Sequence, residues 1–389
     1  MKIAYVYDAV YPWVKGGAEK RVYELAKRLA QRGHEVHWYG VGWWWPEEGQ
    51  KDIELDGICL HGVCGPMELY NDDRRSIKEA IYFALKLIPR LREDNFDIID
   101  CQGFPFFSCF TAKINTISKS TALVITLHEV WDDYWYEYLG KAGIFGRSVE
   151  RWMVNLTDEI ISVSEKTKKD LQRIKKSEKS VVIPNGIDFN AITEVNPSME
   201  KLDFEKSDVM FAGRLIKEKN VDMLIKAIAH LKKEIPGIKC LIVGDGPERD
   251  NLESLTDDLN LTQNIRFTGF TEDHESLISY MMASQVFVLP STREGFGMVI
   301  LEANACGLPV VVVDHPMNAA KDLITERENG FIAELSEKSL ADKILEGINK
   351  KETMKDSCMK FARGYDWDEI VADLEEFYQR VLILLREIN

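Results

Sequence analysis

Residues 286–313 read VFVLPSTREGFGMVILEANACGLPVVVV, and this stretch decides the fold. A short apolar run at 286–289 is followed by a helical stretch at 298–306 and by a second apolar run at 310–313. Neither run alternates polar and apolar residues, which is typical of parallel strands buried on both faces of a sheet. The stretch therefore predicts a strand, a helix and a second parallel strand, the repeating unit of an α/β fold.

The same alternation extends over nearly all 389 residues. Apolar runs predict strands at residues 3–7, 36–41, 98–101, 123–126, 160–163, 209–212, 240–243, 265–268, 286–289 and 310–313. A polar stretch without clear period, residues 187–208, interrupts the pattern and predicts a linker. We therefore expect two Rossmann-like, doubly wound parallel-sheet domains, 1–195 and 207–365, with the closing helix 366–389 joined to the first.

Composition excludes several classes of protein. The 49 Lys and Arg residues against 64 Asp and Glu residues give a net charge of -15, the opposite balance to a nucleic-acid binder, so we expect no nucleic-acid partner. Seven cysteines without a C-x-x-C pair argue against a disulfide framework and favour reduced thiols. With no apolar run of about 18 residues and no room for a signal peptide before the first strand, we expect a cytoplasmic protein, the inner face of the membrane being an alternative location.

The acidity is unevenly divided along the chain. Residues 1–190 carry 26 basic and 28 acidic side chains, whereas residues 191–389 carry 23 and 36. Eight of the nine tryptophans also lie in the first half. The nearly neutral, Trp-rich first half therefore leaves a membrane surface open as a partner, although the chain as a whole is acidic.

Two glutamates, Glu294 and Glu302, flank a Gly-Phe-Gly turn that opens a helix. Backbone N–H groups of Phe296 and Gly297 at that helix start suit phosphate or sugar hydroxyls. Eight helical residues rise about 12 Å, whereas a glycosidase needs its two carboxylates about 5 to 9.5 Å apart. The pair therefore suits two parts of one extended ligand better than one bond.

Two cations follow the predicted strand 209–212, Arg214 directly after Gly213 and Lys219 five residues later. The carboxyl end of a parallel strand faces the crevice where such sheets bind ligands, and a diphosphate needs this charge. A solvated basic loop is the alternative. The glycine turn at Gly244 is expected to form a wall of the same crevice, although turn chemistry alone also explains it.

A second glycine turn, Gly16-Gly17, lies between the first strand and its helix. Such a turn lets backbone N–H groups approach an anion at the positive end of a helix, and a simple tight turn is the alternative. No G-x-G-x-x-G follows the strand, which argues against a dinucleotide dehydrogenase.

These motifs occur together in an order that resembles a known family. The E-x7-E pattern with G-F-G-M and L-E-A, the earlier G-R-L and V-G-D-G-P, the stretch Ile183-Pro-Asn-Gly-Ile-Asp188 and the Gly-Gly-Ala-Glu turn are similar to the retaining glycosyltransferases of family 4. The resemblance covers nearly the whole chain. It implies the glycosyltransferase-B fold, in which the N-terminal half binds the acceptor, the C-terminal half binds a nucleotide sugar, catalysis takes place in the cleft and the last helix crosses back.

The resemblance also implies roles for individual residues. Glu302 would hold the ribose hydroxyls and Glu294 the transferred sugar, Arg214 and Lys219 would neutralise the diphosphate, and Gly17 would close over it. His128 matches the family's cleft histidine near the sugar, although its neighbour is Glu129 where an aspartate is more usual. The predicted catalytic set is His128, Glu294, Arg214 and Lys219. The predicted donor-binding set is Gly16, Gly17, Gly213, Arg214, Lys219, Gly244, Phe270, Glu294, Phe296, Gly297, Met298 and Glu302.

We therefore predict a retaining glycosyltransferase that moves a hexosyl group from a nucleotide-diphosphate sugar to a hydroxyl of a glycan, lipid-linked or small-molecule acceptor. Alternatives are a nucleotide-sugar epimerase and a non-catalytic nucleotide-sugar-binding subunit of a transferase complex. We expect no cofactor and no essential metal, because the D-x-D pattern at Asp366 and Asp368 lies at the start of the final helix and suits a cap.

The donor base and the acceptor are read from aromatic and charged residues. Phe270 ends a strand where the base should rest, and Glu272 and Asp273 after it suit the N–H donors of guanine, which favours GDP-mannose slightly over a UDP-sugar; a helix N-terminus explains the same acids. Acceptor contacts are predicted for the aromatic residues Trp43, Trp131 and Trp135, and packing of the loops is the alternative. A basic cluster predicts peripheral contact with an anionic membrane, with a solvated helix face as the alternative, and comprises Lys166, Lys168, Lys169, Arg173, Lys175, Lys176 and Lys179.

Overall fold

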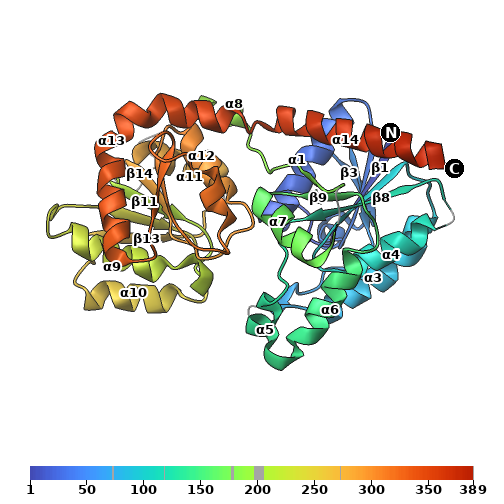
Figure 1. Cartoon of the computed structure of the whole chain (residues 1–389), viewed down its shortest axis with the longest axis horizontal. Coiled ribbons are helices and arrows are strands. Elements are labelled where there is room, and N and C mark those ends of the chain that lie inside the picture. Colours follow the sequence, from blue (N-terminus) through green and yellow to red (C-terminus); the bar gives the residue numbers. More distant parts are fainter. Residues whose placement is uncertain (72–73, 118, 177–178, 197–205, 272, 389) are drawn as a thin grey trace. The chain divides into compact units, whose positions relative to one another are not determined.

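The computed structural model describes residues 1–389 except 72–73, 118, 177–178, 197–205, 272 and 389 (Figure 1). The chain folds as two compact units, residues 1–185 with 367–389 and residues 186–366. Residues 186–195, which the sequence placed in the first domain, therefore belong to the second unit. None of the described helices is both long enough and apolar enough to cross a bilayer.

The first unit is built on an eight-stranded sheet in the order β10-β9-β8-β7-β1-β2-β4-β3. Its strands are β1 (Lys2–Val6), β2 (Glu35–Gly40), β3 (Asp52–Leu55), β4 (Ile58–Gly62), β7 (Ile98–Gln102), β8 (Ala122–Leu127), β9 (Ile160–Ser162) and β10 (Val181–Val182). All neighbours pair in parallel except β3 and β4. The short strands β5 (Tyr70–Asn71) and β6 (Arg74–Arg75) form a separate antiparallel pair.

Helices cover both faces of this sheet (Figure 1). They are α1 (Gly17–Gln31), α2 (Trp45–Glu48), α3 (Ile77–Arg92), α4 (Phe107–Thr116), α5 (Tyr134–Leu139), α6 (Gly143–Met153), α7 (Glu165–Ile174) and α14 (Trp367–Ile388). Inward side chains of α3, α4 and α6, such as Phe83, Cys109 and Met153, meet Val6 of β1 in one buried core. Helix α14 packs on α1 at the other face.

The second unit has a six-stranded, wholly parallel sheet in the order β13-β12-β11-β14-β15-β16. Its strands are β11 (Val209–Ala212), β12 (Cys240–Val243), β13 (Ile265–Gly269), β14 (Val286–Leu289), β15 (Val310–Val313) and β16 (Gly330–Ala333). Its helices are α8 (Phe189–Glu194), α9 (Val221–Leu231), α10 (Arg249–Asp258), α11 (His274–Ala283), α12 (Met298–Ala305) and α13 (Glu337–Arg363). The doubly wound parallel folds predicted for both halves are confirmed.

The linker predicted at 187–208 contains one turn and a half of helix, α8. Asp188 caps it by accepting a hydrogen bond from the backbone N–H of Ala191 at 3.0 Å, and the side chains of Phe189 and Ile192 are buried. Helix α8 packs on α12. The predicted linker thus includes a short helix, because two apolar residues in a polar stretch are enough to fix it on a neighbouring helix.

Each sheet has one place where the strand order reverses. In the first unit it lies between β1 and β7, and in the second between β11 and β14. Loops that leave the carboxyl ends of the two central strands diverge there and leave room for a ligand. Among the predicted site residues, His128, Gly213, Arg214 and Glu294 lie on loops that follow strands at or beside these two points, whereas Glu302 lies within α12.

Candidate active site

Lys219 and Glu294 form an ion pair beside the reversal point of the second unit. Nζ of Lys219 donates to Oε1 of Glu294 at 2.5 Å, and the two side chains are 21% and 12% exposed. The loops that carry them are joined by a hydrogen bond from the Thr292 N–H to the Glu218 carbonyl at 2.9 Å. The sequence placed both residues in the site, and the structure brings them into contact.

The backbone of Glu294 is fixed by the loop after β15. Its N–H donates to the Met317 carbonyl at 3.2 Å, and its carbonyl accepts from the Ala319 N–H at 2.9 Å. Between these two residues lies Asn318, which is fully buried and donates from Nδ2 to the Val313 carbonyl at 3.0 Å. Glu294 is therefore held by buried backbone contacts, while its carboxylate reaches Lys219.

The turn after Glu294 requires glycine at Gly297. This residue has φ of +100° and precedes the first residue of α12. A Cβ there would lie 3.0 Å from the Cβ of Ala320, so any other residue would be strained as well as crowded. In the described chain, no acceptor lies within hydrogen-bond reach of the N–H groups of Phe296 or Gly297. These amides are available to an anion or a hydroxyl.

A second glycine, Gly244, allows two loops of the site to touch. It has φ of +134°, and a Cβ there would lie 1.9 Å from the carbonyl oxygen of Gly213. The loop after β11 is tied to the loop after β12 by a hydrogen bond from the Leu215 N–H to the Asp245 carbonyl at 2.9 Å. Gly244 thus holds the loop that carries Arg214, whose side chain is exposed.

Glu302 is buried on α12 and has a partner that the sequence did not reveal. Its Oε1 lies 3.0 Å from Nε2 of His274, the first residue of α11. Phe270, predicted beside the base, is exposed on the loop before that helix, and Glu272 lies outside the described residues. The one available signal for His274 was its position at a helix start next to the predicted base site.

In the first unit, His128 follows β8 and is held by a chain of hydrogen bonds. Its Nε2 lies 2.8 Å from Oε1 of Gln102, and Nε2 of Gln102 donates to Oδ1 of Asp100 at 3.1 Å. Asp100 also accepts from the hydroxyl groups of Thr126 at 2.8 Å and Tyr378 at 2.6 Å. Glu129, which stands beside His128 where an aspartate is more usual, accepts from Trp131 Nε1.

This chain sets the tautomer of His128. The amide N–H₂ of Gln102 must face Asp100, because a carboxylate only accepts hydrogen bonds, so the amide oxygen faces the imidazole and Nε2 carries a proton. Desolvation, together with the nearby charge of Arg21, lowers the pKa of His128 to about 3. The imidazole is therefore neutral near pH 7, with Nδ1 as an acceptor.

Arg21 places a buried positive charge close to this chain. The residue is 1% exposed on α1 and donates from Nη1 to Oδ1 of Asn185 at 3.0 Å and to the Pro184 carbonyl. Burial lowers its pKa to about 10 against the opposing effect of Asp100. Arg21 therefore stays charged at neutral pH and anchors the Pro184-Asn185 end of the predicted Ile-Pro-Asn-Gly motif.

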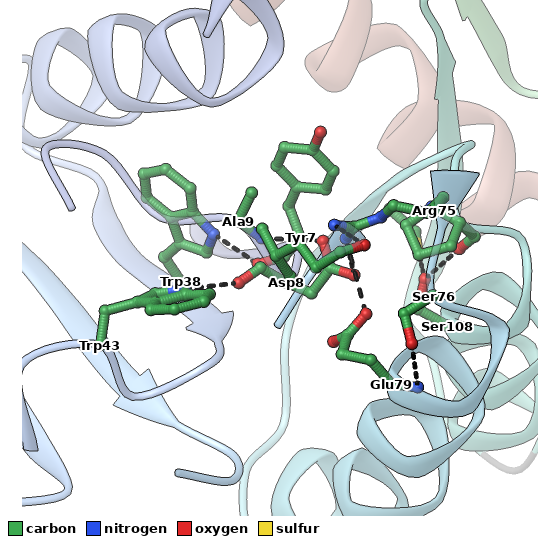
Figure 2. Close-up of polar contacts among 12 residues, drawn as sticks. Tyr7, Asp8, Ala9, Trp38, Trp43, Arg75, Ser76, Glu79 and Ser108 are labelled. Atoms are coloured by element: carbon green, nitrogen blue, oxygen red, sulfur yellow. Dashed lines mark hydrogen bonds and ion pairs between the residues drawn. The ribbon is translucent and has the colours of Figure 1, made fainter. Parts of the chain in front are cut away.

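A group of buried acids follows the end of β1 (Figure 2). Asp8 is paired with Arg75, and a carboxylate oxygen of Glu79 lies 3.6 Å from the same guanidinium. Burial and Asp8 raise the pKa of Glu79 to about 8. Burial also raises the pKa of Glu19, in the predicted Gly-Gly-Ala-Glu turn, to about 7. A Cβ on Gly16 would lie 2.6 Å from Oε1 of Glu19, so glycine there makes room for the carboxylate.

The aromatic residues predicted for the acceptor pack on their own unit. Trp135 is buried in the core, and Trp131 and Trp43 pack partly buried against it. Trp131 and Trp135 lie with ring centroids 4.6 Å apart, and Trp43 donates to the Asp8 carbonyl at 3.3 Å (Figure 2). In this structure the three side chains pack within the first unit, as the alternative of loop packing predicts.

The predicted basic cluster on α7 is not a continuous surface of cations. Lys175 is buried, where its Nζ donates to the Val154 carbonyl at 2.8 Å. Lys166 and Arg173 are paired with Asp170. The cluster is thus divided between buried, paired and exposed side chains, because a run of lysines in the sequence does not show which of them turn inward.

The two acids of the D-x-D pattern take part in structural contacts. Asp366 accepts from the Phe189 N–H at 3.1 Å, and Asp368 accepts from Nε of Arg28 at 2.8 Å. Within the described residues, no group of three or more His, Cys, Asp or Glu side chains is arranged to hold a metal ion.

Comparison with known proteins gives two family matches that together span most of the chain. Residues 15–191 match the model of Glycosyltransferase Family 4, and residues 194–363 match that of Glycosyl transferases group 1. A similar curated protein is the alpha-monoglucosyldiacylglycerol synthase of Streptococcus pneumoniae, 28% identical over 90% of this chain and 78% of that protein. Another is the N-acetyl-alpha-D-glucosaminyl L-malate synthase of Bacillus anthracis, 25% identical over 96% of each chain.

Solved structures share the fold at low sequence identity. A sucrose-phosphate synthase from Thermosynechococcus elongatus superimposes with a TM-score of 0.82 at 20% identity, over 98% of this chain and 99% of that one. HepE of Anabaena, solved in complex with UDP and glucose, gives a TM-score of 0.74 at 23% identity, over 97% and 98% of the two chains. The chain therefore belongs to glycosyltransferase family 4 and has the glycosyltransferase-B fold.

Proposed function

We propose that the protein is a retaining hexosyltransferase that uses a nucleotide-diphosphate sugar. The observation that carries the proposal is the Lys219–Glu294 pair next to the unbonded amides of Phe296 and Gly297. A diphosphate sugar offers an anion for the cation and the amides, and hydroxyl donors for the carboxylate. This arrangement therefore suits both the diphosphate and the sugar of one ligand.

The leaving group is stabilised by the second unit. As the C1–O bond to the diphosphate breaks, negative charge grows on the phosphate oxygens, and Lys219, Arg214 and the amides at the start of α12 neutralise it electrostatically. Lys219 exchanges its contact with Glu294 for the diphosphate, and Glu294 then accepts hydrogen bonds from sugar hydroxyls. Glu302 holds the ribose. The proposed mechanism includes no metal or cofactor, because Lys219, Arg214 and the amides at the start of α12 supply the positive charge that the diphosphate needs.

The new bond forms on the face from which the diphosphate leaves. The acceptor oxygen bonds to C1 of an oxocarbenium-like sugar, and its proton passes to an oxygen of the departing phosphate. His128 does not take that proton, because its pKa is held near 3. Its Nδ1 instead accepts a hydrogen bond from a sugar hydroxyl, in the tautomer that Gln102 fixes.

A UDP-sugar is the favoured donor and GDP-mannose the comparison. Glu272, one of the two acids that favour guanine, lies outside the described residues, whereas HepE was solved with UDP and glucose. The acceptor is a hydroxyl of a lipid, a glycan or a small molecule. A lipid is favoured by the name of one relative, a monoglucosyldiacylglycerol synthase, and a small acid by that of another, a malate glycoside synthase.

Thermal-shift measurement with a panel of nucleotide sugars identifies the donor, since a ligand at 100 times its Kd stabilises the folded state by about 2.7 kcal/mol. Glu294→Ala is then tested for release of the nucleoside diphosphate in the presence of an acceptor mixture. We expect loss of transfer with an unchanged melting temperature. Glu253→Gln, a change at an exposed glutamate of α10, is the matched control. Full activity of Glu294→Ala would refute the site.

A further inference from the structure

Exposed apolar side chains concentrate on three helices of the first unit. Among the described residues, fourteen large hydrophobic side chains are exposed, and nine of them lie on α3, on α6 or at the end of α4. They are Ile77, Ile81, Tyr82, Leu85, Ile114, Ile117, Ile144, Phe145 and Trp152. Phe145 and Ile117 are each 74% exposed, so these side chains are in contact with water rather than at the rim of the core.

The three helices present these side chains on the same side of the sheet. Their inward side chains, including Phe83 of α3, Cys109 of α4 and Met153 of α6, belong to one buried core. Helices α3 and α4 also pack against each other, and Figure 1 shows α3, α4 and α6 together on the side away from α1 and α14. The exposed apolar residues therefore lie on one side of the unit, here called the α3–α4–α6 face.

The charged side chains that these three helices themselves expose are basic. Helices α3, α4 and α6 contain only two acids, Glu79 and Glu150, and both are buried. Their basic residues are Lys78, Lys86, Arg90, Arg92, Lys113, Arg147 and Arg151. Arg90 pairs with Asp52 and Glu93, and Arg147 and Arg151 pair with Asp132. Among the described residues, the positive charge outside ion pairs on these helices is that of Lys78, Lys86, Arg92 and Lys113. The face is therefore apolar and basic in a chain whose net charge is -15, so overall composition does not account for it.

We propose that the α3–α4–α6 face docks on an anionic lipid bilayer. Contiguous exposed apolar side chains mark interaction surfaces, and helices with an apolar side and flanking Lys or Arg lie in the interface plane of anionic membranes. On α3 a basic and an aromatic side chain lie together, because Nζ of Lys86 is 5.5 Å from the ring centroid of Tyr82. Docking goes beyond transfer itself, since it determines where the enzyme works rather than which bond it makes.

Charge argues for a membrane over a second copy of the chain. In a two-fold symmetric dimer the same patch contacts itself, so Lys78 and Lys86 would face their own equivalents. No acid on the outer sides of α3, α4 and α6 offsets that repulsion. Lipid phosphates supply the opposite charge across the whole face. The docking surface is thus made of other residues than the α7 lysines and the tryptophans from which the sequence predicted it, although Trp131 and Trp135 both donate to Glu150 of α6 and so lie beside that helix.

The apolar part is tested by flotation with vesicles of phosphatidylcholine alone or mixed with phosphatidylglycerol. The wild type should float with the anionic vesicles and much less with the neutral ones. Leu85→Ser/Phe145→Ser/Trp152→Ser, all at exposed positions, should lower binding by about tenfold or more. Leu335→Ser/Ile383→Ser is the matched control, because it removes two exposed apolar side chains elsewhere, and it should float like the wild type.

The basic part is tested by Lys78→Ala/Lys86→Ala, which should weaken binding by about fivefold per lysine. Lys169→Ala/Lys176→Ala, at exposed lysines in and just after α7, should change binding little. Absence of flotation of the wild type would overturn docking, and so would full flotation of the triple serine variant. A wild-type dimer that the triple variant converts to a monomer, without vesicle binding by either, would show that the face is a subunit interface. The thermal shift with nucleotide sugars is measured on the same variants and should not change, so failure of docking and failure of the proposed donor site are distinguished.

Discussion

The two units differ in how many charged side chains they bury. Among the described residues, the first unit buries seven charged side chains, Asp8, Glu19, Arg21, Glu79, Asp100, Glu150 and Lys175, and the second buries one, Glu302. The second unit keeps its ion pairs, including Lys219–Glu294, partly exposed. Buried groups respond to pH, whereas exposed pairs respond to salt and to ligands. The buried charges of the first unit are thus already paired inside the fold, whereas in the proposed function the second unit exchanges its partly exposed pair for the ligand.

The largest expected effect comes from the exposed pair of the second unit. Lys219→Gln should lower kcat/KM by about 100- to 1,000-fold, because a charge that stabilises the leaving diphosphate is lost. The fold should be unaffected, and the effect is measured with the donor identified by thermal shift. Lys217→Gln, at an exposed lysine in the same turn, is the control. If Lys217→Gln lowered kcat/KM by the same factor, the effect would come from the total positive charge of this turn rather than from Lys219 itself.

A smaller loss is expected when the hydrogen-bond chain of the first unit is broken. Gln102→Leu removes the acceptor for His128 Nε2–H and should lower kcat by about 10- to 100-fold with little change in donor KM. Gln102→Glu restores an acceptor and brings a negative charge, so it should raise the pKa of His128 from about 3 as measured by NMR titration. If neither variant moves kcat or the histidine pKa, Gln102 does not position His128.

The smallest expected effect is a change in stability with pH, and it comes from Glu79, one of the buried acids of the first unit. The pKa of folded Glu79 is about 8, well above its ordinary value of about 4.3. The folded state therefore holds a proton more tightly, and the stability that this proton gives is present below pH 4 and lost as the pH rises through 8. Glu79→Gln keeps a donor for Asp8 and should melt about 3 °C or more above the wild type at pH 8.5, with little difference at pH 5.

The control for this pH dependence lies in the second unit. Glu337→Gln changes a glutamate whose side chain is 44% exposed and should leave the pH dependence of the melting temperature as in the wild type. Equal slopes for wild type and Glu79→Gln between pH 5 and 8.5 would contradict the buried-acid explanation.

The fold was predictable because hydrophobic patterning is local. The runs at 209–212, 240–243 and 286–289 are strands with the predicted bounds. The partner of His128 was not predictable, since Gln102 is 26 residues away and meets it through the register of β7 and β8. Burial of Trp135 and Lys175 also depends on packing across several elements. Helix α3 has apolar side chains on both its inner and its outer face. Hydrophobic periodicity therefore does not show which of the two faces packs on the sheet.

The bond from Tyr378 to Asp100 has a consequence for synthesis of the chain. Residues 1–185 leave the ribosome first, and domains generally fold as they emerge, but the acid chain behind His128 takes a donor from 278 residues further on. Trp367, Val371 and Leu374 of the same helix are buried in this unit as well. The first unit to be made is therefore the last to be completed, and until α14 arrives its nascent form carries a buried carboxylate without one of its donors and an uncovered apolar face.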